Sequence, residues 1–233
     1  MGAMKSQYKG DKKTESVVAD FLDQYFYPKL NIHRFQRITD LDQQHRGMDV
    51  VFTANNQPYI VDEKAQLHYN PPLPTFAFEV KYKKNGIWKP GWLFDQTKET
   101  QYYLLVWPKR DDVDLKELEV NNIKTTEVML ISRKQLLDYL NNSFQINEKT
   151  VELEATAIIH EKQFGKLHTI HPDSTHYYFY TERLAETPIN IVIQKNTLKQ
   201  LALFHFVVYR NKPYCKSQQS EAWLRDEYIR LQR

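Results

Sequence analysis

Two candidate strands on either side of an Asn-Asn pair constrain the fold of this chain more than any other feature. Residues 48–53 (MDVVFT) and 59–68 (YIVDEKAQLH) are candidate strands, and Asn55-Asn56 lies between these segments. Asparagine tolerates the backbone conformation of tight turns, so the pair favours a two-residue hairpin loop. Such a loop fixes the register, because the numbers of facing residues then add up to 111.

This register brings two carboxylates together. Asp49 lies directly opposite Asp62, and opposed residues have Cβ atoms roughly 4.5–5.5 Å apart. Side chains alternate between the faces of a strand, so Lys64 and Gln66 share the face of Asp62, whereas Glu63 points to the opposite face and has a predicted structural role. Two like charges at this separation destabilise a fold unless something compensates them.

A divalent cation would supply the compensation. Mg²⁺ prefers oxygen ligands and usually takes one or two protein carboxylates together with waters and phosphate oxygens. A metal held by Asp49 and Asp62 would polarise a phosphodiester and lower the pKa of a bound water. Lys64 could orient or deprotonate that water, or stabilise the developing negative charge. The pattern therefore predicts phosphodiester hydrolysis with Mg²⁺, or with Mn²⁺ as a substitute.

The arrangement resembles the PD-(D/E)xK nuclease superfamily, which has the restriction-endonuclease-like fold. Its motif is an acid on one strand and an acid-x-lysine on the next, after an N-terminal helix. Asp49 matches the first acid, Asp62 the second and Lys64 the lysine, although no proline precedes Asp49. The resemblance covers about residues 14–110. It implies a metal-dependent endonuclease that acts on nucleic acid, with DNA favoured over RNA, and double-strand cleavage would favour a homodimer.

Many members of this superfamily add a glutamate from the first helix, and Glu15 is the candidate here. Val18, Ala19 and Leu22 follow it at spacings of three, four and seven residues, which predicts that Glu15 lies on the core-facing side of the helix. An acid in the first turn is also favoured by the helix dipole. A purely structural role for Glu15 therefore stays open.

A rival acid-x-lysine pattern, Glu79-Val80-Lys81, lies in another candidate strand. The chain holds four such tripeptides, so the pattern alone carries little information. Asn85-Gly86 predicts a hairpin in which facing residues add up to 171. Glu79 then faces Trp92 rather than another acid. Glu79 would be a third acid of the site only if its strand lay beside residues 59–66.

Basic and aromatic residues interleave over residues 81–92 (KYKKNGIWKPGW). Such a hairpin could grip a phosphate backbone while its aromatic rings stack on bases or pack beneath it. A solvated hairpin with its tryptophans in the core explains the pattern equally well. The predicted nucleic-acid contacts are Lys81, Lys83, Lys84, Lys89 and Gln66.

The order of elements predicts an α/β or α+β protein with a mixed central sheet flanked by helices. We expect a restriction-endonuclease-like core over residues 14–140 and a C-terminal α+β extension over residues 141–233, packed as one domain. The predicted helices cover residues 14–30, 132–140, 197–203 and 218–231. The predicted strands cover residues 34–41, 48–53, 59–68, 75–83, 102–107, 128–131, 151–159, 176–181 and 189–193.

Composition excludes several classes of protein. The net charge is only +3, which is unlike a histone-like polycation but does not exclude phosphate partners. One cysteine, Cys215, excludes a disulfide framework and a cysteine-rich zinc site, and predicts a reducing cytoplasm. No window approaches about 18 consecutive apolar residues, so no membrane-spanning helix is expected.

Two alternatives to a nuclease remain open. The first is a non-catalytic nucleic-acid-binding or assembly module that keeps the nuclease-like fold. The second is an interaction domain in which the charges of the hairpin are surface decoration, since strands with charged outer faces are common.

Overall fold

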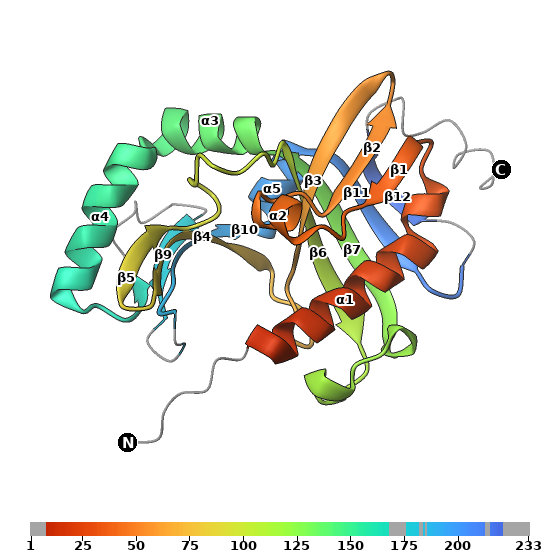
Figure 1. Cartoon of the computed structure of the whole chain (residues 1–233), viewed down its shortest axis with the longest axis horizontal. Helices are drawn as coiled ribbons and strands as arrows, with labels where there is room; N and C mark the ends of the chain where they lie inside the picture. The colour runs from red at the N-terminus through yellow and green to blue at the C-terminus, as the bar shows by residue number, and fades with distance from the viewer. Residues whose placement is uncertain (1–7, 168–175, 182–183, 185, 213–214, 221–233) are drawn as a thin grey trace. The chain divides into compact units, whose positions relative to one another are not determined.

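A computed structural model describes residues 8–167, 176–181, 184, 186–212 and 215–220 (Figure 1). These residues divide into two compact units. The seven-stranded unit takes its described residues from Gln7–Leu73, Glu99–Ser132 and Lys199–Arg233. The five-stranded unit takes them from Pro74–Lys98 and Arg133–Leu198. The division therefore does not follow the expected boundary at residue 140. In the described part of the chain, no helix is long and apolar enough to cross a membrane.

The seven-stranded unit is built on a mixed sheet. Its strand order is β1-β2-β3-β6-β7-β11-β12, and among these strands β3 and β6 pair in parallel while the other neighbours are antiparallel. This mixed sheet confirms the predicted mixed α/β class. The strands are β1 (His33–Arg37), β2 (Val50–Ala54), β3 (Gln57–Ala65), β6 (Tyr102–Arg110), β7 (Ile123–Ser132), β11 (Ala202–Tyr209) and β12 (Cys215–Ser220).

The hairpin of β2 and β3 has the predicted register. Val50 faces Val61 and Ala54 faces Gln57, so facing residues add up to 111. Asn55 and Asn56 form the two-residue turn with φ values of 52° and 60°. Both values lie in the left-handed region that asparagine tolerates, and such turns match the twist of the paired strands.

Helix α1 (Tyr8–Tyr25) covers one face of this sheet, as Figure 1 shows. Its apolar positions recur at helical spacing, and Val18, Phe21 and Leu22 are buried in the core of the unit with residues from β2, β3, β6, β7 and β11. A short 3-10 helix, η1 (Tyr27–Lys29), follows α1. The other helical segments of the unit are α2 (Leu41–His45), η2 (Leu115–Glu117) and η3 (Val120–Asn122).

The five-stranded unit has an antiparallel sheet with the order β5-β4-β10-β9-β8. The strands are β4 (Thr75–Lys84), β5 (Ile87–Pro90), β8 (Gly165–Leu167), β9 (His176–Tyr180) and β10 (Ile189–Gln194). In the hairpin of β4 and β5, Lys83 faces Trp88, which confirms the predicted sum of 171. Helices α3 (Arg133–Phe144) and α4 (Glu148–Glu161) lie along one face of this sheet (Figure 1). Helix α5 (Lys195–Leu201) follows β10.

Three predicted elements need correction. Residues 151–159, expected as a strand, belong to α4, where Val151, Ala155 and Ile158 are buried at helical spacing. The helix expected at 197–203 ends at Leu201, because residues 202–209 form β11 between β7 and β12. Of the residues expected as a helix at 218–231, residues 218–220 belong to strand β12. The residues beyond 220 lie outside the described part of the chain.

Candidate functional site

Asp49 immediately precedes β2, which begins at Val50. Its backbone N–H donates to the carbonyl of Val61 at 2.9 Å, although Val61 is the partner of Val50 in the hairpin register. Gly47, two residues earlier, has a φ of 77°, and its carbonyl accepts from the Thr100 hydroxyl at 2.8 Å. The backbone N–H of Glu63 donates a hydrogen bond to Oδ2 of the Asp49 carboxylate at 2.8 Å. This bond fixes one carboxylate oxygen against the neighbouring strand.

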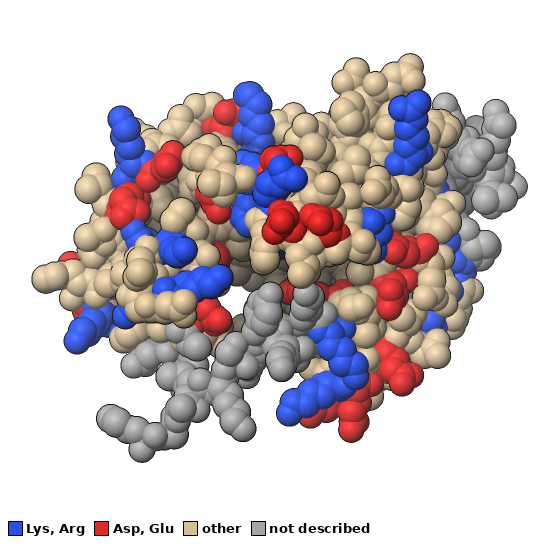
Figure 2. Space-filling model, viewed as in Figure 1, with Lys and Arg blue, Asp and Glu red and all other residues tan. Residues whose placement is uncertain are grey.

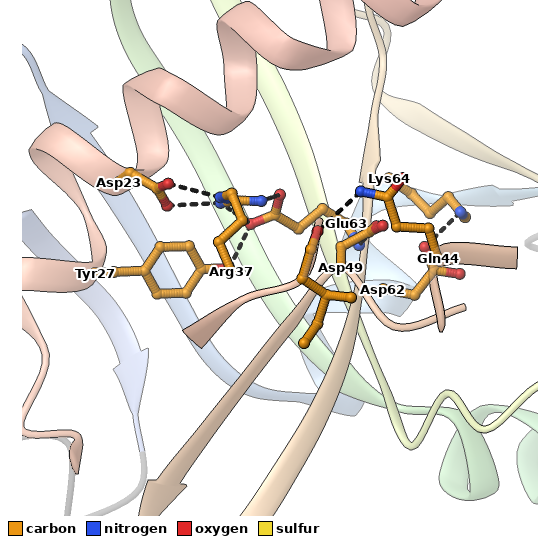
Figure 3. Close-up of polar contacts among 9 residues, drawn as sticks. Asp23, Tyr27, Arg37, Gln44, Asp49, Asp62, Glu63 and Lys64 are labelled. Carbon is orange, nitrogen blue, oxygen red and sulfur yellow. Dashed lines mark hydrogen bonds and ion pairs between the residues drawn. The ribbon is translucent and has the colours of Figure 1, made fainter. Parts of the chain in front are cut away.

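Asp62 and Lys64 complete a cluster of three charged side chains with Asp49. The Asp62 side chain is only 3% exposed, and Lys64 Nζ lies 2.5 Å from Asp62 Oδ1. Figure 3 shows Asp49, Asp62 and Lys64 close together on the same stretch of the hairpin. The structure thus brings together the two acids and the lysine that the sequence analysis singled out.

Burial and the neighbouring charges shift the pKa values of Asp49 and Lys64. Burial raises the pKa of Asp49 above its ordinary value, the negative charge of Asp62 raises it further, and the positive charge of Lys64 lowers it only in part. For Lys64, burial alone would lower the pKa, but the charges of Asp62 and Asp49 outweigh burial and raise it. Lys64 is therefore held as an ammonium at neutral pH.

Glu15 lies elsewhere on its helix than expected. Its side chain is exposed, whereas Thr14 and Val18 beside it are buried, so the prediction that Glu15 faces the core is wrong. Val18 follows Glu15 at a helical spacing, but this spacing does not bury the carboxylate. Helix α1 begins at Tyr8, so Glu15 also lies beyond the first turn in which it was expected. Its negative charge nevertheless acts on Lys64 and contributes to the raised pKa of that ammonium. Glu15 is thus an outer charge of the cluster.

Gln66 was predicted as a nucleic-acid contact, and Glu79 was considered as a third acid of the site. Gln66 follows β3, and its side-chain Oε1 accepts the N–H of Leu73 at 2.5 Å, which ties down the proline-containing loop after the strand. Glu79 lies on β4, whose partners are β5 and β10. The condition that would make Glu79 a third acid, a strand beside β3, is not met.

The predicted basic contacts of the β4–β5 hairpin divide into buried and exposed lysines. Lys81 is 7% exposed and forms an ion pair with Glu152 of α4, which corrects its assignment as a nucleic-acid contact. Lys83 is exposed, with its Nζ 5.8 Å from the centre of the Trp88 ring. Lys84 and Lys89 are exposed.

A second polar network, on the other side of β3, was missed by the sequence analysis. Arg37 of β1 donates to both carboxylate oxygens of Asp23 at 2.6 Å and to both of Glu63 at 2.8 and 3.1 Å. The Tyr27 hydroxyl donates to Glu63 Oε1 at 2.5 Å. Figure 3 shows this network leading from α1 to the backbone of β3. The alternation of faces predicted the direction of Glu63, but nothing local in the sequence pairs it with a residue 26 positions earlier.

The Arg37 network supports the geometry of the acid pair. Glu63 is anchored by its side chain on one side of β3, and its backbone N–H holds the Asp49 carboxylate. The peptide between Asp62 and Glu63 is therefore fixed from both sides. The position of the two acids depends on contacts that involve α1, β1, β2 and β3.

The donor set fits a hard divalent cation. Within the described ranges, no group of three or more histidine, cysteine, aspartate or glutamate side chains is arranged to hold a metal ion. Asp49 and Asp62 supply two carboxylates, which is the usual protein contribution to a Mg²⁺ site that is completed by water and phosphate oxygens. Burial and the charge of Asp62 raise the pKa of Asp49, and a cation bound between the two carboxylates would lower it.

Comparison of the chain with protein-family models, with curated proteins and with solved structures found no match. The likeness of residues 14–110 to a nuclease superfamily therefore stays a prediction from the motif.

Proposed function

We propose that this chain is a Mg²⁺-dependent nuclease that hydrolyses phosphodiester bonds in nucleic acid, with DNA favoured over RNA by analogy with the superfamily that its motif resembles. The seven-stranded unit would be the restriction-endonuclease-like core. One observation carries the proposal: the carboxylate of Asp49, just before β2, interacts with that of Asp62 on β3, and the ammonium of Lys64 lies against Asp62. Buried like charges are costly, so their conjunction is better explained by a bound cation than by packing.

The residues divide the chemistry between them. Asp49 and Asp62 would hold Mg²⁺, which when bound supplies a Lewis acid for the phosphodiester and an activated water. Lys64 keeps its proton, because Asp62 and Asp49 raise its pKa. This supports a role in orienting water or stabilising negative charge, and argues against proton abstraction. The exposed Glu15 would help to keep Lys64 protonated, because its negative charge raises the pKa of Lys64.

A single cysteine suits a reducing cytoplasm, which we propose as the location. Cleavage of both strands of a duplex would be served by a homodimer with two sites.

The test is a cleavage assay with the purified chain. Plasmid, linear single-stranded DNA and RNA are incubated with Mg²⁺, with Mn²⁺ and with EDTA. The variants are Asp62→Asn and Lys64→Met, and the matched control is Asp20→Asn, which removes an exposed acid of α1. We expect metal-dependent cleavage that both site variants lose and the control keeps.

Two outcomes would contradict the proposal. Equal cleavage by Asp62→Asn and the wild type would place the activity elsewhere or in a contaminant. Binding of nucleic acid without cleavage under any metal condition would favour the non-catalytic binding module.

A further inference from the structure

The sheet of the five-stranded unit has one covered face and one accessible face. Along β9, His176, Tyr178 and Tyr180 are buried, whereas Tyr177 is half-buried and Phe179 is 36% exposed. The ring of His176 contacts Phe144 of α3, with ring centres 4.0 Å apart, which assigns the covered face to the helices. Tyr177 and Phe179 point to the other face, because successive side chains alternate.

Lysines share this accessible face with the aromatic rings. Lys166 of β8 pairs with Phe179, and its Nζ lies 4.3 Å from the centre of the Tyr177 ring. At the other edge of the sheet, Tyr82 of β4 pairs with Lys89 of β5. Lys84 lies two residues after Tyr82 and therefore on the same face. Lys84, Lys89 and Lys166 are all exposed.

The charges of this unit are divided between sheet and helix. The accessible face carries Lys84, Lys89 and Lys166 and one acidic residue, Glu79, which pairs with Asn190 beside Phe179. Lys81 points to the covered face, where it is ion-paired with Glu152 of α4. Helix α4, against the covered face, carries four glutamates and one lysine. Figure 2 shows Lys and Arg side chains over the region of β5, and acidic together with basic side chains over that of α4. A polyanion would therefore be drawn to the sheet.

The aromatic rings restrict the kind of polyanion. Rings on a flat sheet bind nucleic acid by stacking on bases, and lysines beside them pair with phosphates. The faces of bases in a duplex are already stacked on one another, so they are available only in single strands, loops and ends. A lysine patch without accessible rings would not make this distinction.

We propose that the accessible face of the five-stranded sheet binds single-stranded nucleic acid, with Tyr82, Tyr177 and Phe179 as the stacking platform and Lys84, Lys89 and Lys166 as the phosphate contacts. This inference rests on the proposed function in one respect, that the ligand is a nucleic acid. It adds a second site and the strandedness of the ligand.

The test is fluorescence anisotropy with a labelled dT20 oligonucleotide in EDTA, so that binding is measured without cleavage. Phe179→Leu keeps an apolar side chain but cannot stack, and we expect it to weaken the Kd by about five- to a hundredfold. Phe179→Tyr restores a ring and should bind within about twofold of the wild type. The control is Lys134→Ala, an exposed lysine of α3, which should leave the Kd unchanged.

Salt dependence tests the lysines separately. Loss of one phosphate contact in Lys166→Gln should reduce the slope of log K against log salt by about 0.7. Circular dichroism of each variant checks that the chain is folded. If Phe179→Leu does not fold, Lys166→Gln and Lys89→Gln carry the test, since both positions are exposed.

Several results would overturn the inference. They are the absence of dT20 binding, a duplex of the same length bound more tightly than dT20, and a Kd for dT20 that Phe179→Leu and Lys166→Gln leave unchanged. Polyphosphate that competes as well as dT20 would also overturn it, because polyphosphate has no bases to stack. Binding in EDTA without metal-dependent cleavage would refute the proposed function and leave this inference standing.

Discussion

Replacement of Asp49 by asparagine would test the central electrostatic feature of the site. Burial and the charge of Asp62 raise the pKa of Asp49, so ionised Asp49 destabilises the metal-free fold. Asparagine keeps a side-chain oxygen that can accept the Glu63 N–H, now 2.8 Å from Asp49 Oδ2, but it carries no charge. The substitution therefore removes the repulsion and retains the hydrogen bond.

The expected gain follows from the register of the hairpin. Two unit charges about 5 Å apart repel by about 3 kcal/mol at an effective dielectric constant of about 20. Lys64, whose ammonium lies 2.5 Å from Asp62 Oδ1, offsets part of this repulsion. We expect the free energy of unfolding of Asp49→Asn in EDTA to exceed that of the wild type by about 1–3 kcal/mol near pH 9.

The sign of the pH dependence is fixed by the direction of the shift. The pKa of Asp49 is raised in the folded state, so the folded chain retains a proton that the unfolded chain has lost. The wild type therefore loses stability as the pH rises from about 4, the ordinary value of an aspartate, through the raised value. Below about pH 4 Asp49 is protonated in both states, and the difference from Asp49→Asn should disappear.

Urea unfolding of both proteins near pH 4 and near pH 9, in EDTA and then in Mg²⁺, makes the measurement. Mg²⁺ should stabilise the wild type at the higher pH and leave the variant nearly unchanged, because ligand binding to the folded state alone stabilises it. The exposed Asp20 provides the control Asp20→Asn, for which neither effect is expected. A variant less stable than the wild type at both pH values would refute the reasoning.

Three further predictions concern the surroundings of the site and the second sheet. Lys64→Met should lower the rate of metal-dependent cleavage by at least about 100-fold, measured under single turnover, and an unchanged rate would remove Lys64 from the mechanism. Arg37→Met leaves the Asp23 and Glu63 carboxylates without their shared cation, and should lower the free energy of unfolding in urea by about 1–3 kcal/mol. Gly91→Ala places a Cβ 2.4 Å from main-chain atoms of Glu79, so backbone must move; thermal unfolding should show a loss of about 1–3 kcal/mol, and wild-type stability would contradict the contact.

The two hairpins could be predicted because a two-residue turn determines the register locally. Asn55-Asn56 sets the sum of 111 and Asn85-Gly86 the sum of 171, and both registers are confirmed. The proximity of Asp49 to Asp62 and Lys64 follows from the first register. No long-range information was needed for this part of the site.

The division into two sheets could not be predicted in the same way. Strand β4 pairs with β10 more than 100 residues later, and nothing within β4 specifies that partner. The network around Arg37 was missed for the same reason, because three separate segments supply its residues. The spacing of Glu15 from Val18 and Leu22 suggested burial, but a spacing cannot tell how far the neighbouring layer extends.

The error in α4 had a local signal. Its apolar residues include valine and isoleucine, which favoured a strand, but they recur at intervals of three and four. Asn147 precedes them as a cap: its side chain accepts the N–H groups of Lys149 and Thr150, and the Thr150 hydroxyl accepts the Asn147 N–H in return. This capping box was visible in the sequence.

The order in which the seven-stranded sheet takes its strands has a consequence for synthesis on the ribosome. Hairpins β2–β3 and β6–β7 each lie within a short stretch of chain and can form as soon as they emerge. The other edge of β7 pairs with β11, which is synthesised some 70 residues later. During that interval a nascent chain presents an uncovered strand edge, the kind of surface on which chains pair with one another. A fragment that stops at residue 140 would keep this edge permanently, so we expect it to aggregate where the chain with β11 does not.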